Sequence, residues 1–152
     1  MGRSDKKAIR AVETKGVKGA VPSIKPGSYY GLSPTFSFRK YDAEAPWAVS
    51  ADGRPTVDRL FKMLCSIELS TWGEIRQASG GRSHGTNSHP ISIREMAREA
   101  QNRAADIALL EDELFSLRLT STVRLWGVIE PSKGCFFVIW YDPNHSICPI
   151  DK

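Results

Sequence analysis

Cysteine is scarce in this sequence and long apolar runs are missing, and both absences limit what the protein can be. The 152 residues include three cysteines, Cys65, Cys135 and Cys148, and no two of them form a CxxC pair. An odd number leaves at least one thiol free in a monomer, which argues against a disulfide-stabilised secreted protein and for a reducing cytosol. No segment approaches the roughly 20 apolar residues of a membrane span, and the N-terminus has no apolar signal core. We therefore expect a cytoplasmic protein without a membrane partner.

Positive and negative charges are unevenly distributed along the chain. Residues 1–40 hold nine Lys or Arg and two acidic residues, whereas residues 41–152 hold twelve Lys or Arg and fifteen acidic residues. Residues 1–34 also have little periodic apolar content. We interpret 1–34 as a flexible basic arm and 35–152 as a single domain of ordinary size. Such an arm can follow phosphates or an acidic partner, although a solvated leader has the same composition.

Apolar periodicity and turn residues predict the ordered elements. They are a strand over 35–41, a helix from the N-cap Thr56 to Ile67, a short helix from Thr71 to Ala78, a helix over 93–108, and strands over 113–119, 124–130 and 135–141. The last three strands can form an antiparallel meander, with the first strand at an edge of the sheet. Two or three helices packed on one face of this sheet give an α+β fold.

Arg118 and Arg124 flank the turn Thr120–Ser121–Thr122, so they are expected to lie near one another on adjacent strands. Together with His145, they make a set that can cleave a phosphodiester without a metal. The arginines stabilise the charge on phosphorus while the histidine transfers a proton. The alternative is that the arginines are surface partners of the acidic residues 111–113.

The last strand ends in a polar corner that contains Asp142, Asn144 and His145. In a functional interpretation Asp142 orients His145 and raises its basicity. In a structural interpretation Asp142 caps the turn through the backbone, and His145 fills the corner.

The segment 79–90, SGGRSHGTNSHP, has no large apolar residue and is expected to be a surface loop. Arg82, His84 and His89 are suited to contact a phosphate or a base, and the alternative is a plain connector. A metal site would need His145 and a distant acid, because the loop has no Cys or carboxylate, so no metal or other cofactor is expected. Trp126 is a core candidate that could stack on a base if its ring faced outward.

Residues 89–149, including HPIS, LFSLRL, RLWGVIE and FFVIWYDPNHSICP, resemble a pattern in small proteins of bacteria and their mobile elements. More distantly, a helix followed by a meander that carries arginines and ends near a histidine resembles the RelE-type toxins of toxin–antitoxin pairs. The resemblance implies a metal-independent endoribonuclease that acts on RNA or the ribosome and has a cognate antitoxin. It gives Arg118 and Arg124 the phosphate-binding role and His145 the acid–base role. The alternative function is a non-enzymatic interaction protein, such as an antitoxin, phage accessory or inhibitor protein, that binds a protein or nucleic-acid partner.

Overall fold

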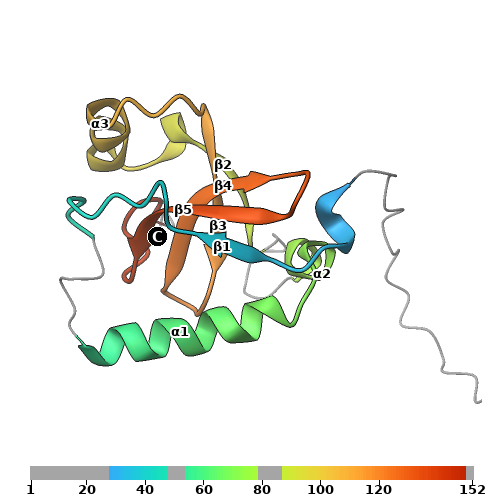
Figure 1. Ribbon diagram of the computed structural model, residues 1–152. Helices are drawn as coiled ribbons and strands as arrows, with labels where there is room; N and C mark the ends of the chain where they lie inside the picture. Colours follow the sequence, from blue (N-terminus) through green and yellow to red (C-terminus); the bar gives the residue numbers. More distant parts are fainter. Residues whose placement is uncertain (1–27, 48–53, 79–86, 150–152) are drawn as a thin grey trace, which may run out of the picture.

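The computed structural model describes residues 28–47, 54–78 and 87–149, with only the backbone described for 54–56. A five-stranded mixed sheet in the order β1-β5-β4-β3-β2 forms its centre (Figure 1). The strands are β1 (Thr35–Ser37), β2 (His89–Ser92), β3 (Glu113–Arg118), β4 (Arg124–Glu130) and β5 (Cys135–Asp142). The expected α+β fold is confirmed.

The meander β3-β4-β5 is antiparallel, as the sequence predicts. β1 occupies one edge and pairs with β5 in parallel. The opposite edge holds β2, antiparallel to β3. The prediction of a loop through Pro90 was wrong at its end, because His89 and Pro90 belong to this strand. A proline fits there because its missing N–H faces an unpaired edge.

The β4–β5 hairpin owes its geometry to two glycines. Gly134 has a φ of 63°, in the left-handed region that glycine enters without strain, and its N–H donates to the carbonyl of Glu130. Further along, the register shifts between Trp126 and Gly127, which is a β-bulge. A Cβ on Gly127 would collide with the carbonyl oxygen of Phe137, so the bulge requires glycine.

Three α-helices accompany the sheet: α1 (Arg54–Glu68), α2 (Trp72–Gln77) and α3 (Arg98–Asp106). α2 begins with the predicted capping box, in which Thr71 Oγ1 accepts from the Glu74 N–H and the Glu74 carboxylate accepts from the Thr71 N–H. α1 starts at Arg54, so Thr56 lies inside its first turn and is not the N-cap. The helix predicted over 93–108 is divided into a 3₁₀ turn, η3 (Ile93–Glu95), and α3.

Helices cover both faces of the sheet. Figure 1 shows α1 beneath it and α3 on the opposite side. On the α1 and α2 face, Leu60, Leu64 and Trp72 pack with inward residues of β3, β4 and β5. On the other face, Met96 and Ala100 pack with apolar residues that include Trp126 and Trp140. The helices are therefore not confined to one face.

The fold begins before the boundary predicted at residue 34. The 3₁₀ turn η1 (Tyr29–Gly31) packs its Tyr29 ring edge-on against Trp72, and the carbonyl of Leu32 accepts from the Trp72 backbone N–H. Pro34 is fully buried. Residues 28–34 therefore belong to the domain, and residues 1–27 lie outside the described residues.

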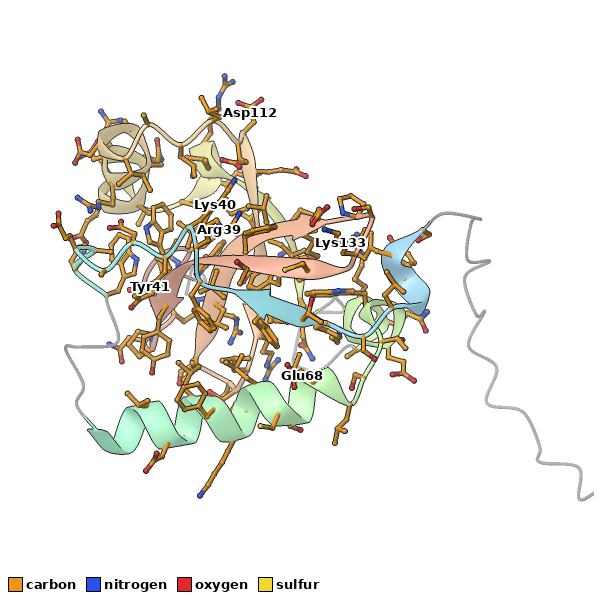
Figure 2. The ribbon with its side chains drawn as sticks, viewed as in Figure 1. Arg39, Lys40, Tyr41, Glu68, Asp112 and Lys133 are labelled. Carbon is orange, nitrogen blue, oxygen red and sulfur yellow. The ribbon has the colours of Figure 1, made fainter. Side chains whose placement is uncertain are left out.

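Two ion pairs hold the loop after β1 against the second half of the chain. The Asp42 carboxylate accepts hydrogen bonds from Nε and Nη2 of Arg103 at 2.7 and 2.6 Å. It also accepts one from Nε1 of Trp140 at 3.0 Å. Lys40 Nζ lies 3.0 Å from a carboxylate oxygen of Glu111. Figure 2 labels Lys40 in this loop, together with Arg39 and Tyr41.

Candidate functional site

Strand register places three charged residues in one row across the sheet. Arg118 lies opposite Arg124, and Arg124 lies opposite Asp142. Directly opposed residues of antiparallel strands share a face, and this is the face that carries Trp126 and Trp140. We call Arg118, Arg124 and Asp142 the arginine row. The expectation that the two arginines lie near one another is confirmed.

One backbone oxygen links the two guanidinium groups. The carbonyl of Thr120 accepts from Nε of Arg118 at 3.1 Å and from Nη1 of Arg124 at 2.7 Å. Arg118 Nη1 also donates to Oδ1 of Asn87 at 2.6 Å. The turn after β3 therefore fixes both side chains, and the two positive charges are held together.

Arg124 is a largely buried cation, with 6% of its surface exposed. The Nη1 atom of Arg124 donates hydrogen bonds to the carbonyls of Thr120 and Val123. Its Nε and Nη2 atoms make no hydrogen bond with the described residues. Arg124 forms no ion pair within the described residues. Burial and, to a smaller extent, the charge of Arg118 together lower the pKa of Arg124 to about 10, against an opposing effect of the charge of Asp142. The fold thus holds a guanidinium that is poorly solvated and incompletely neutralised.

The unused N–H groups of Arg124 still reach solvent. In the described part of the chain, the fully buried side-chain nitrogen and oxygen atoms without a hydrogen bond are the indole nitrogens of Trp47 and Trp126. Because Nε and Nη2 of Arg124 are not among them, they retain contact with the outside. Each of these two nitrogens therefore keeps a small solvent-accessible area, although Arg124 as a whole is largely buried.

Asp142 supports the corner and does not orient His145, so that expectation was wrong. It is fully buried, and its carboxylate accepts from the backbone N–H and hydroxyl of Ser146 and from the N–H of Ile147. These bonds hold the corner in which His145 has a φ of 55°. The imidazole makes no hydrogen bond with the described residues. Asp142 therefore shapes the backbone around His145, as the structural interpretation had it.

The other expected site residues fall in different places. Trp126 is fully buried beneath α3, which confirms the core interpretation and excludes the alternative that it stacks on a base. His89 is exposed on β2 and lies opposite Ser116, which precedes Arg118 by two residues on β3. Arg82 and His84 lie outside the described residues.

Asn87 is a site residue that the sequence interpretation missed. It belongs to the segment 79–90, interpreted as a loop, and it approaches Arg118 because β2 pairs with β3. Ser88, which is buried, accepts from the Arg118 backbone N–H at 3.0 Å. A contact that spans some thirty residues leaves no local signal in the sequence.

A cleft beside β3 and β4 has a different electrostatic character from the arginine row. It has a volume of about 770 Å³ and is lined by Glu111, Asp112 and Glu113, with Arg76 and Tyr29 also at its wall. Arg76 is held by Tyr29 and lies over the rings of Tyr30 and Phe115. Three carboxylates disfavour a phosphate, so the cleft is not the candidate anion site.

In the part of the chain that the structure describes, no group of three or more His, Cys, Asp or Glu side chains is arranged to hold a metal ion. Of the helices in the same part, none combines the length and apolar character that a membrane span requires.

Comparison with protein families, curated proteins and solved structures finds no match.

Proposed function

We propose that the protein acts on RNA and binds a backbone phosphate at the arginine row, through Arg124 and Arg118. The observation that carries the proposal is Arg124, a buried guanidinium with two N–H-bearing nitrogens left for a ligand. Burying a charge without full compensation is unfavourable, and proteins keep such groups where a ligand completes them. A phosphate would supply the missing negative charge.

The arrangement of the two side chains fits a phosphate. Guanidinium groups donate parallel hydrogen bonds to phosphate oxygens. Because Arg118 and Arg124 bond one carbonyl oxygen, neither needs to reorganise before an anion arrives. The buried Asp142 balances one of the two positive charges, so the row retains a net positive charge.

RNA is the phosphate source that the rest of the chain supports. Residues 1–40 contain nine Lys or Arg against two acidic residues, and such a segment attracts a polyanion through counterion release. Residues 41–152 have a net negative charge, so contact with RNA would concentrate at the row and at the N-terminal residues. This distribution favours a polymer with many phosphates over a single small anion.

The test is binding of a single-stranded RNA of about eight nucleotides, comparing Arg124→Met with Arg59→Met. Both variants remove one arginine, but Arg59 is exposed on α1. Arg124→Met should weaken RNA binding about tenfold. It should also reduce the slope of log affinity against log salt concentration by about one. Arg59→Met should change the affinity by less than about twofold. Equal losses in the two variants would mean that only total charge matters, and would overturn the proposal.

A second candidate function is cleavage of the bound RNA, with His145 as the proton-transfer group. The corner built by Asp142 supports it, because Asp142 is the residue opposite Arg124 and fixes the backbone that carries His145. The imidazole is half-buried and makes no hydrogen bond with the described residues, so it is available to a substrate. The first function requires only the arginines, whereas the second requires His145 as well.

A further inference from the structure

A second cavity lies on the α1 and α2 face of the sheet, at the β2 side, and shares Arg118 with the arginine row of the opposite face. It has a volume of about 280 Å³, close to the lower end of the roughly 300–1,000 Å³ range of small-molecule sites. Arg118 lines it together with Asn87 and Ser88, and its apolar wall includes Ile67, Ile75 and Leu119. Arg118 thus borders both the cavity and the row.

We propose that this cavity binds the nucleobase next to the phosphate held by the arginine row, an inference that rests on the proposed function. A base is flat and apolar on its faces and polar at its edge. The cavity has the same two parts, an apolar wall from α1, α2 and the end of β3 and a polar side from Asn87 and Ser88. Hydrogen bonds connect the cavity to the row around the end of β3: Asn87 Oδ1 accepts from Arg118, and the Thr120 carbonyl accepts from both arginines. A single nucleotide would span this connection.

Asn87 supplies an oriented donor for the edge of the base. Its Oδ1 accepts from Arg118 at 2.6 Å, which fixes the direction of the amide. Nδ2 makes no hydrogen bond with the described residues, so its N–H groups are available to a carbonyl oxygen or ring nitrogen of a base. The Asn87 backbone N–H donates to the carbonyl of Ala78 at 3.0 Å, which holds the residue against the end of α2.

Glu74 makes the cavity unsuitable for a second phosphate. It lines the same space, and one of its carboxylate oxygens accepts from the Thr71 N–H in the α2 capping box. A carboxylate repels an anion but tolerates a neutral base. The phosphate therefore belongs at the arginine row and the base in the cavity.

The test uses the full chain and compares inorganic phosphate with each of the four ribonucleoside 5′-monophosphates by calorimetry. Arg124→Met identifies the binding that depends on the row. Ala78→Met places a larger side chain in the cavity, from an exposed position at the end of α2. Gln77→Met is the matched control, because Gln77 is also exposed but does not line the cavity. Circular dichroism checks that each variant folds.

We expect at least one nucleotide to bind about tenfold more tightly than phosphate in the wild type and in Gln77→Met. In Ala78→Met the advantage should vanish, while phosphate affinity stays within about twofold. Equal affinities of the wild type for nucleotide and phosphate would overturn the base site and leave the phosphate site standing. Tighter binding of nucleotide than of phosphate by Ala78→Met would have the same consequence. Absence of any binding that depends on Arg124 would overturn both.

Discussion

Arg118 and Arg124 lie opposite one another on β3 and β4, and both donate to the carbonyl oxygen of Thr120. Like charges on directly opposed strand positions are destabilising. The fold nevertheless holds these two together and buries one of them. Four predictions test this pair of arginines, the corner at His145 and two contacts that stabilise the fold.

His145→Asn tests the second candidate function. Asparagine tolerates the left-handed backbone found at His145, so the corner should keep its shape while the proton-transfer group is lost. Induced expression in a bacterial host should arrest growth for the wild type but not for His145→Asn, and the purified wild type should cleave single-stranded RNA. His145→Ala should behave in the same way, with some loss of stability because alanine is strained at this φ. Equal growth of wild type and His145→Asn would remove the cleavage function and leave phosphate binding untouched.

Asp42→Asn tests the ion pair that joins the loop after β1 to α3. The hydrogen bonds from Arg103 hold the pKa of Asp42 below its ordinary value; burial opposes this, and Trp140 assists it. The ionised Asp42 carboxylate therefore contributes its full stabilisation above the pKa that it has in the unfolded chain, near 3.9. This stabilisation is lost as the pH falls through the lower pKa of Asp42 in the folded protein. Chemical denaturation at neutral pH should show a loss of about 1–3 kcal/mol in Asp42→Asn, and a smaller loss at pH 3.

The matched control is Glu111→Gln, which breaks the more exposed pair with Lys40. This change should lower the free energy of unfolding by less than about 1 kcal/mol. A loss in Asp42→Asn that is the same at pH 7 and pH 3 would show that the charge of Asp42 is not what stabilises the loop.

Gly127→Ala tests the β-bulge. An added Cβ would meet the carbonyl oxygen of Phe137, which belongs to the backbone of the paired strand and has little room to move. The free energy of unfolding should fall by about 3 kcal/mol or more. Gly31→Ala is the control, because no atom lies within 4 Å of the added Cβ, and it should change stability by less than about 0.5 kcal/mol. If the two variants melt alike, the bulge does not depend on glycine.

Much of the fold is predictable because its signals are local. The meander shows in runs of apolar and β-branched residues separated by turns, and the capping box of α2 shows in the spacing of Thr71 and Glu74. β2 could not be predicted in the same way, because its four residues include a proline and become a strand only by pairing with β3. The same long-range pairing brings Asn87 to Arg118.

Distance along the chain decides which features of the site could be predicted. The neighbouring arginines were predictable, since a short turn between two strands places its flanking residues opposite one another. The turn-capping role of Asp142 was also predictable, because Ser146 and Ile147 follow it closely in the chain. The covering of Trp126 by α3 was not, because that helix is distant in the sequence.

Arg124→Met probes the central claim through stability. Methionine fills a similar space without a charge, and the two carbonyls that Arg124 contacts keep other donors: Thr120 retains Nε of Arg118, and Val123 retains the backbone N–H groups of residues 119 and 120. Replacing a buried, incompletely paired charge by an apolar side chain should therefore raise the free energy of unfolding by about 1–3 kcal/mol.

The most direct test is thermal unfolding of wild type and Arg124→Met with and without inorganic phosphate at constant ionic strength. An anion that binds only the folded state raises the melting temperature. The account predicts that phosphate stabilises the wild type, and that Arg124→Met melts higher in its absence and gains nothing from it. A lower melting temperature for Arg124→Met without phosphate, or an equal gain from phosphate in both proteins, would contradict a phosphate site at the arginine row.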